Sequence, residues 1–498
     1  IENENVSQVV DAEAQLSNFI STKVHDLQLT FAEQVLILEG SQLGKADCTI
    51  PPYVEYENIL PQTDDTIDIS PFVIRSEIIE WVLNPVVSSI LFKTGSLQVV
   101  GADFVGTQDL GVYNRNEFLK TSNRFSLDLS NREVQVNLEF IHCTLYSGIN
   151  ISNAVTKDLV FDRCWFGKAI KDHSIWAESA RVKGGLKITV PKNKIRNPKK
   201  GENTAFSGHI NFSYATVGGG FKIEGYNNPN DFRDSITVKG EVELTGLRAD
   251  RIFLNHVSVA QSFDFSLAAV GNITIYGSRL GSVNGGGVKC DSIFIRGGTF
   301  VEKGAFFHKA EINTDLHCAN SFFGQSAEEE RWGIAVSTSH STIQNLIFDE
   351  GSIVLSGVVD LRNCFIQNKF SIKDTILFGG EMDNRWVAIW APNLTVGNKA
   401  NFNPYNTAKE TKYKYESLFN AIKKKVEEFK EKSKFDKEYW DVLECHKRIK
   451  EYMELNLVNY AKTIPRDFID CLDGHMIEKY GLIMEIIQSK SPNENQKE

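Results

Sequence analysis

The sequence predicts a mainly β protein, a right-handed parallel β-helix of about 21 residues per coil, with a mixed N-terminal cap and a C-terminal α-helical domain. Three observations predict it. Short alternating apolar segments recur at a fixed interval, turn-forming residues follow them, and both ends of the chain change to helical spacing. The expected domains are 1–87 for the mixed α/β cap, 88–402 for the β-helix with corner insertions, and 403–498 for the helical domain.

The N-terminal cap is expected from two segments with helical spacing, 11–24 and 69–83, which flank an acidic, proline-bearing stretch from Pro51 to Asp68. Apolar residues at intervals of three and four indicate amphipathic helices. A cap is needed because the open end of a β-helix presents unpaired strand edges, which promote association. The 18 acidic and 6 basic residues in 1–120 make this part of the chain negative.

The repeat is clearest after residue 240, where strands are expected to begin at Val242, Ile252, Phe263, Ile273 and Ile293. Equivalent strands therefore recur at about 21 residues. A short strand with apolar residues at every second position buries one face and cannot fold alone. Stacking satisfies such strands, because each coil pairs with the coils before and after it. Cys143 and Cys164, 21 residues apart, fit one stacked interior ladder.

Similar segments extend the repeat in both directions. They lie at 126–131, 136–140, 159–163, 186–190, 210–214 and 221–225 upstream, and at 316–320, 346–350, 353–357, 359–363, 370–374 and 394–398 downstream. Insertions are expected near 191–205, 226–233 and 324–342, and insertions in a solenoid tend to gather on its binding face. The triplets Gly218–Gly220 and Gly285–Gly287 are expected at tight corners rather than in phosphate-binding loops.

The C-terminal domain is expected to be helical. Its first helix carries apolar residues at helical spacing: Tyr415, Leu418, Phe419, Ile422, Val426 and Phe429. A second helix carries Tyr439, Trp440, Leu443, Tyr452 and Met453. Two more are expected from Pro465 and over 475–488.

Residues 120–400, with segments such as SGHINFSYATVGGGFKIEG, resemble bacterial parallel β-helix proteins of the pentapeptide-repeat-like kind, which are often catalogued as membrane-associated oxidoreductases. The five-residue register of that group is kept only loosely, as in EVELTGLRAD. The part that contains Tyr415, Leu418 and Tyr439-Trp440 also looks like the helical segment that follows the repeats in membrane-tethered relatives. The resemblance implies the β-helical fold, and for tethered relatives it implies transmembrane helices beyond.

Location and redox state follow from the apolar runs and the cysteines. No apolar run approaches the roughly 18–20 residues of a membrane-spanning helix, so a soluble protein without a transmembrane segment is expected. The eight cysteines occur singly, without a C-x-x-C pair or zinc-ligand spacing. We therefore expect reduced thiols in a bacterial cytoplasm, and no metal or other cofactor.

No catalytic constellation is evident, and the chain is predicted not to be an enzyme. Asn313-Thr314-Asp315 and Arg448-Ile449-Lys450 match parts of polygalacturonase sites by chance. His308 and His317 are the closest histidine pair, expected to pack or to face solvent. The acidic residues of the repeats are dispersed and are expected at solvated outward positions: Asp264, Asp291, Asp315, Asp360 and Asp374.

The strongest local feature is a basic run, with eight basic and no acidic residues from Arg181 to Lys200. Such a loop would attract an acidic protein, a nucleic acid or an anionic surface, or it would simply be solvated. The sequence therefore predicts a non-enzymatic scaffold that binds another macromolecule, most readily a protein. The predicted contact residues are Lys192, Lys194, Arg196, Lys199 and Lys200 in the loop and Tyr415, Phe419, Tyr439 and Trp440 in the helical domain.

Two alternatives remain open. A carbohydrate-active β-helix enzyme, a polysaccharide lyase or hydrolase, would place Trp165, Trp176 or Trp332 beside paired carboxylates. A DNA-mimic regulator would need a dense acidic face, for which the N-terminal region is the candidate. The identity of the partner and the oligomeric state do not follow from the sequence.

Overall fold

The computed structural model describes residues 29–49, 72–92, 94–106, 125–167, 172–189, 205–225, 236–319, 321–324, 333–349, 353–354, 357–373, 376–377, 380–382, 385–387 and 389–403. Of these residues, 55% lie in strands, and three helices are present. The chain divides into unit 1, Ile1–Asn228 with Arg233–Thr274, and unit 2, Pro229–Phe232 with Ile275–Glu498. The predicted helix at 11–24 and the helical domain after Asn403 lie outside the described residues.

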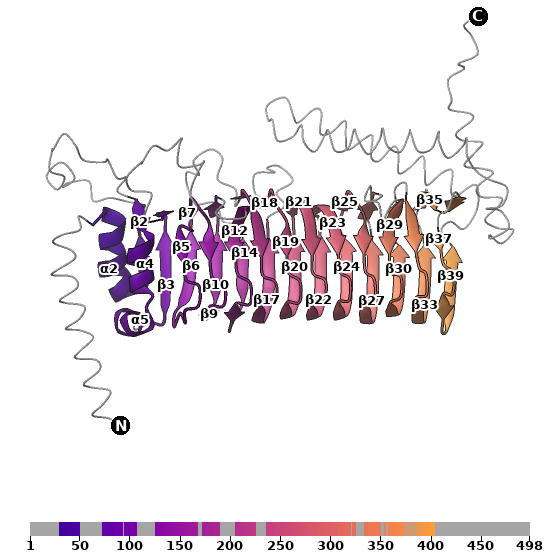
Figure 1. Cartoon of the computed structure of the whole chain (residues 1–498), viewed down its shortest axis with the longest axis horizontal. Helices are drawn as coiled ribbons and strands as arrows, with labels where there is room; N and C mark the ends of the chain where they lie inside the picture. Colours follow the sequence, from indigo (N-terminus) through magenta and orange to yellow (C-terminus); the bar gives the residue numbers. More distant parts are fainter. Residues whose placement is uncertain are drawn as a thin grey trace, which may run out of the picture. The chain divides into compact units, whose positions relative to one another are not determined.

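The strands of unit 1 form three parallel series (Figure 1). The first is β1 (Lys45–Asp47), β3 (Ser96–Val100), β6 (Asn137–Ile141), β10 (Leu159–Asp162), β14 (Leu186–Thr189), β17 (Thr216–Glu224) and β20 (Arg248–Asn255). In addition, β13 (Arg181–Val182) pairs with β17, and β9 (Val155–Thr156) pairs with β13. The second is β2 (Val73–Arg75), β4 (Asp103–Val105), β7 (Thr144–Leu145), β11 (Trp165–Phe166), β15 (Ala205–Phe206), β18 (Ile236–Val238) and β21 (Val257–Asp264). The third is β5 (Leu127–Asp128), β8 (Ile149–Asn150), β12 (His173–Trp176), β16 (His209–Asn211) and β19 (Val242–Glu243), and it also ends at β21.

Unit 2 repeats this arrangement, and the unit boundary falls within β22 (Ala269–Tyr276). Its first series is β24 (Lys289–Arg296), β27 (Glu311–Ala319), β30 (Thr342–Asp349) and β33 (Phe365–Lys373), followed by β38 (Thr395–Val396) and β39 (Lys399–Asn403). Two further series begin at β23 (Arg279–Asn284). One continues through β25 (Thr299–Val301), β28 (Ser321–Phe323), β31 (Ile353–Val354) and β34 (Ile376–Leu377). The other continues through β26 (Ala305–Phe306), β29 (Ile334–Ser337), β32 (Val358–Asp360) and β37 (Ile389–Trp390). One described pair, β35 (Gly380–Met382) with β36 (Arg385–Val387), is antiparallel. The strand β29 lies inside the predicted insertion at 324–342, which is therefore shorter than expected.

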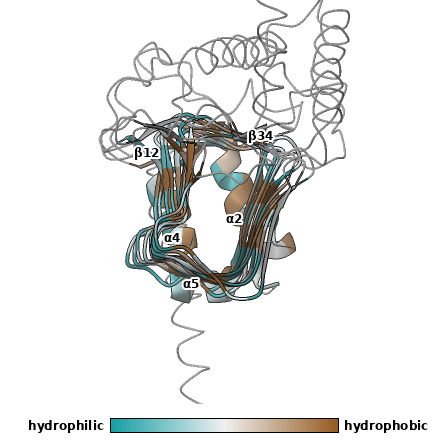
Figure 2. Ribbon diagram, turned by 90° about the vertical axis from the view of Figure 1, so that its right-hand side faces the viewer, coloured by the Kyte–Doolittle hydropathy of each residue, from teal (hydrophilic) through white to brown (hydrophobic). Residues whose placement is uncertain are grey.

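The core consists of the inward side chains of successive strands. In β10, Leu159 and Phe161 are fully buried while Val160 and Asp162 are half-buried, and hydrophobic and hydrophilic residues alternate along the strands in the same way (Figure 2). Parallel register stacks like residues, so the Phe140 and Phe161 rings lie 5.4 Å apart with their planes 13° from parallel. This stacking joins the short strands into one continuous core.

One corner of unit 1 repeats a polar turn. The side chains of Asn150, Asn211 and Asp264 each accept a hydrogen bond from the backbone N–H two residues later, at 2.8–3.0 Å. The residue after that N–H takes a positive φ, which Asn, Asp and Gly adopt most readily. Leu267 occupies this position with φ 58°. This repeated turn determines where the chain leaves each strand and which side chains point outward beside the turn.

The N-terminal cap is held by a buried ion pair. The helices α2 (Phe31–Leu43), α4 (Ser76–Val82) and α5 (Pro85–Leu91) lie beside β2 and β3 (Figure 1). Glu33 caps α2 by accepting the Thr30 N–H at 3.0 Å and also accepts the Arg75 N–H at 2.9 Å. The Arg75 guanidinium donates to both Glu33 oxygens at 2.7 Å. These bonds tie the helix to β2 and offset the cost of burying two charges.

Of the eight cysteines predicted to be reduced thiols, Cys445 and Cys471 lie outside the described residues. The six described cysteines are buried free thiols, and Cys143 and Cys164 follow strands that pair through Ile141 and Asp162. Burial raises the pKa of the Cys164 thiol well above its ordinary value. No helix among the described residues has the length and apolarity needed to cross a bilayer.

Gly218–Gly220, predicted at a tight corner, lie inside β17, at the point where its register with β20 shifts between Val217 and Gly220. A Cβ on Gly218 would stand 2.2 Å from the backbone oxygen of Lys183. A glycine is needed there because the neighbouring backbone approaches closely. Gly287 turns the chain, with φ 67°.

Candidate carboxyl and imidazole site

Two glutamates and a histidine meet on the outward face of unit 1. Glu241 and Glu243 flank the fully buried Val242 of β19, so both carboxyl groups point away from the core. On the neighbouring strand β16, Ile210 pairs with Val242, which places His209 beside Glu241. Each of the three side chains is half-buried.

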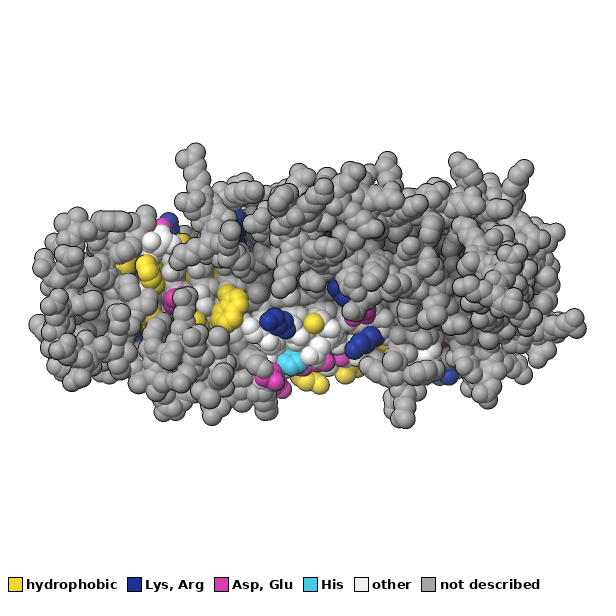
Figure 3. Space-filling model, turned by 90° about the horizontal axis from the view of Figure 1, so that it is seen from above, with side chains coloured by type: hydrophobic (Ala, Val, Ile, Leu, Met, Phe, Trp, Pro, Cys, Tyr) yellow, Lys and Arg dark blue, Asp and Glu magenta, His cyan; other side chains and the backbone are white. Residues whose placement is uncertain are grey.

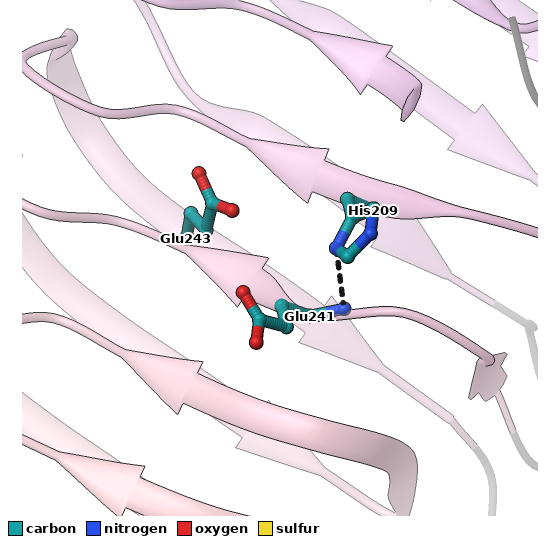
Figure 4. Close-up of side chains that lie close together, drawn as sticks. All are labelled: His209, Glu241 and Glu243. Carbon is teal, nitrogen blue, oxygen red and sulfur yellow. Dashed lines mark hydrogen bonds between the residues drawn. The ribbon is translucent and has the colours of Figure 1, made fainter. Parts of the chain in front are cut away.

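Hydrogen bonds position this group (Figure 4). The backbone N–H of Glu241 donates to Nδ1 of His209 at 3.1 Å, and Nδ2 of Asn211 donates to Oε2 of Glu243 at 2.7 Å. One potential ligand atom from each of His209, Glu241 and Glu243 lies within 4.8 Å of the others. The sequence reaches this geometry because β16 and β19 alternate polar and apolar residues in matched register.

The carboxyl group of Glu243 holds its proton near neutral pH. Its pKa is raised from 4.5 to about 7, first by desolvation and then by the charge of Glu241 and a hydrogen bond with it. Asp264 and Glu178 raise the pKa of Glu243 further. The negative charge of Glu241 therefore favours the protonated form of the Glu243 carboxyl group.

The same atoms are the one group of three potential metal ligands in the described ranges. His209 is poorly placed for that role. A neutral imidazole has one lone pair, and here Nδ1 uses it to accept the N–H of Glu241, so Nε2 carries the proton. A cation would have to displace this hydrogen bond and also the proton on Glu243. The arrangement suits proton transfer better than metal binding.

Aromatic rings adjoin His209. The His173 ring lies 5.7 Å from that of His209 and stacks on Trp176 at 5.2 Å with a 21° interplanar angle. In the strand register Trp176 lies beside Asn211, the residue that donates to Glu243. Figure 3 shows one face of the molecule, on which a histidine lies beside acidic side chains. Trp176 lies two strands from Glu243, with Asn211 of β16 between them, and its indole N–H donates to Glu178 at 3.3 Å.

The residues predicted to contact a macromolecule are not among those that the structure describes. Lys192, Lys194, Arg196, Lys199 and Lys200 lie outside the described residues, as do Tyr415, Phe419, Tyr439 and Trp440. Trp332 lies outside them too, while Trp165 contacts Tyr146 edge-on with ring centroids 6.1 Å apart. Of the basic run, Lys183 forms an exposed ion pair with Glu133 at 3.0 Å.

Unit 2 contains a second polar cluster. Ser337 donates to Asp360 at 3.0 Å, and Nδ1 of His308 lies 2.5 Å from the Ser339 hydroxyl. Asp360 bonds to serine and to the Arg362 guanidinium at 2.8 Å; it does not orient the imidazole, so the group lacks the geometry of a Ser-His-Asp triad.

The outward position predicted for Asp360 is wrong, because the residue is fully buried. Its bonds to Ser337 and Arg362 compensate this burial. His308 and His317 have different partners, since His317 pairs with Asp349 at 2.6 Å. The two histidines therefore belong to separate contacts.

Sequence reasoning missed the carboxyl and imidazole group. The signal was present in two parts: the i, i+2 spacing of Glu241 and Glu243, which places both on one strand face, and the His-Ile-Asn pattern that begins at His209. The 32 positions between His209 and Glu241 hid their contact, because an insertion lengthens this turn of the chain. Comparison of the chain with family models, curated proteins and solved structures finds no match.

Proposed function

We propose that the chain is an interaction scaffold of the pentapeptide-repeat-like kind, built on a right-handed parallel β-helix with about 21 residues per uninterrupted coil. The parallel register supports the coil length, since Val242 pairs with Phe263 and Leu138 with Leu159, 21 residues apart in each case. On this proposal, unit 1 carries the surface that contacts another macromolecule.

The observation that carries the proposal is the shared position of two insertions. Thr189 and Glu224 are register partners at the ends of β14 and β17, and the segments 190–204 and 226–235 follow them. The chain returns at β15 and β18, where Ala205 pairs with Thr237. Both insertions therefore leave and rejoin neighbouring strands at one corner. Such clustering is typical of the binding face of a solenoid.

The carboxyl pair lies next to this corner. His209 and Glu241 come four residues after Ala205 and Thr237, just beyond β15 and β18, the first strands after the two insertions. A strongly basic insertion beside an acidic strand face provides charges of both signs. Complementary charges of both signs determine the register of a partner and exclude wrong partners more than they add affinity.

Copurification tests the scaffold. Full-length tagged protein is captured from its native cell at low and at moderate salt, and bound material is identified by mass spectrometry and nucleic-acid staining. We expect a stoichiometric partner that is lost as salt rises, because the contacts are electrostatic. Replacing the five basic residues of 192–200 by Ser should abolish capture without lowering the melting temperature.

A matched control removes the same charge elsewhere, by serine at five exposed basic residues: Lys45, Lys289, Arg296, Lys303 and Lys309. Capture that survives the loop substitutions, or that fails equally in the control, contradicts a specific contact by the loop. A partner-free monomer contradicts the scaffold.

A second candidate is a polysaccharide hydrolase, favoured by the carboxyl pair, with Trp176 two strands away at the same register position. The protonated Glu243 would donate to the glycosidic oxygen as the bond to the anomeric carbon breaks. The negative charge left with Glu241 would stabilise the cationic sugar, and water would then add to it and return a proton to Glu243. A lyase is disfavoured, because Glu178 and Asp264 add negative charge that repels uronate chains.

A polysaccharide panel tests this candidate. Release of reducing ends should fall at least about 100-fold in Glu243→Gln, and wild-type activity should decline above the pKa of Glu243. Glu311→Gln, at an exposed position of unit 2, is the control. Activity retained in Glu243→Gln, or no substrate in the panel, contradicts the enzyme.

A further inference from the structure

The last described strands of unit 2 leave their inward side chains half-exposed. Val359 of β32 and Ile366 of β33 are fully buried, whereas their register partners Ile389 and Val396 are only half-buried. Leu394, near Val396, is also half-buried. The inward-facing side chains therefore change from fully buried to half-buried between one strand and its next register partner.

At the first strands of unit 1, inward residues are covered instead. Ala46 of β1 is fully buried, and so is Leu36 of α2. The two elements pack so closely that a Cβ on Gly40 of α2 would lie 3.8 Å from the Ala46 Cβ. An apolar helix face thus covers inward side chains where the strand series of unit 1 begins.

An uncovered end is costly for two reasons. Full burial of an Ile or Val side chain is favourable, and half-exposed residues do not gain all of this free energy. Within the described part of the chain, β38 and β39 pair with β33 alone, so one edge of each has no described strand partner. Such edges promote association unless something covers them.

We propose that residues 415–429 of this chain dock as an amphipathic helix on the end formed by β37, β38 and β39. The sequence predicts that helix, and its apolar residues recur along one face over four turns. The linker from Asn403 to Tyr415 can span about 40 Å when extended, several times the roughly 10 Å between packed sheets. The helix can therefore reach any point of this end.

The tethered segment is favoured over a second copy of the chain. A short linker gives the segment an effective concentration of about millimolar or more at the end that it must cover. A second copy would bring an equally uncovered end and would have to match strand edges in register. Tyr415 and Phe419 then belong to an internal contact, which leaves Tyr439 and Trp440 as the aromatic residues available to an outside partner.

Photocrosslinking of the full-length protein tests the docking. Benzoylphenylalanine is introduced at Ile389 and, in a second variant, at Val396, and the crosslinked peptides are mapped by mass spectrometry. We expect crosslinks within one chain to peptides that contain residues 415–429. Crosslinks between two chains would establish a second copy as the cover and overturn the proposal, and so would crosslinks within the chain only to other segments.

Hydrogen exchange supplies an independent test. The double variant Leu418→Asp with Ile422→Asp places charges on the proposed contact face and should increase amide exchange in 389–403 about tenfold. The control, Asn420→Asp with Lys424→Asp, adds two aspartates to the polar face of the same predicted helix and should leave exchange unchanged. Unchanged unit 1 amides verify folding. Equal exchange in the two double variants would overturn the proposal, whatever the scaffold experiment shows.

Discussion

Asn211 donates a hydrogen bond to Glu243, with 2.7 Å between Nδ2 and Oε2, across neighbouring strands of unit 1. A donor of this kind stabilises a carboxylate and by itself would lower its pKa. The pKa of Glu243 is nevertheless raised, because desolvation and the charge of Glu241 outweigh the donor. Glu243 occupies the corner position at which Asn150 and Asp264 accept backbone N–H groups. It differs from them because its carboxylate accepts a side-chain N–H, that of Asn211.

Stability should therefore fall as pH rises from about 5 to about 8. The folded protein binds the Glu243 proton more tightly than the unfolded chain, so this contribution is complete below 4.5 and is lost through about 7. Asp162, with its pKa raised to about 6, acts in the same direction. Thermal melts of wild type and Glu243→Gln across this range measure the effect. The variant should show a clearly weaker slope, and an identical slope would refute the assignment.

Glu33→Ala should destabilise the protein by about 3–5 kcal/mol, because it leaves the Arg75 guanidinium buried without its carboxylate. The Glu33 and Arg75 side chains are only 0% and 6% exposed. The control, Glu311→Ala, breaks an ion pair with Lys289 whose side chains are 58% and 64% exposed, and should cost at most about 1 kcal/mol. Urea midpoints compare the two, and similar losses would show that burial does not decide the cost.

Leu267→Asn should stabilise unit 1 by about 1 kcal/mol, since Asn adopts a positive φ more readily than Leu. Leu267 holds φ 58° with its side chain 61% exposed, so little packing is lost. Leu267→Ala keeps the backbone cost and should show no such gain. If both variants raise the urea midpoint equally, the removal of exposed apolar surface explains the effect instead.

Gly218→Ala should destabilise unit 1 by about 1–3 kcal/mol, because the added methyl overlaps the adjacent backbone. The overlap is with the Lys183 oxygen, 2.2 Å from the ideal Cβ position. Gly286→Ala is the matched control, since its Cβ would meet nothing closer than 3.5 Å. Calorimetry on both variants distinguishes close approach from a general effect of glycine replacement.

The strands were predictable because their signal is local. Apolar residues at every second position, as in Leu159 and Phe161, suffice to indicate a one-sided strand. The role of Gly218 was less predictable, because a glycine triplet has two local meanings, a turn or a close approach. The neighbouring strand, far away in the sequence, decides between them.

By itself the sequence determined the β content, the position of most strands and the need for covered ends, since each follows from short-range spacing of apolar residues. Only the tertiary structure decided that His209 meets Glu241, that Asp360 is buried with Arg362, and that Glu33 reaches Arg75. These contacts depend on the register between successive strands, and the lengths of the intervening insertions set that register. No local pattern encodes it, because register is a property of the stacked backbone.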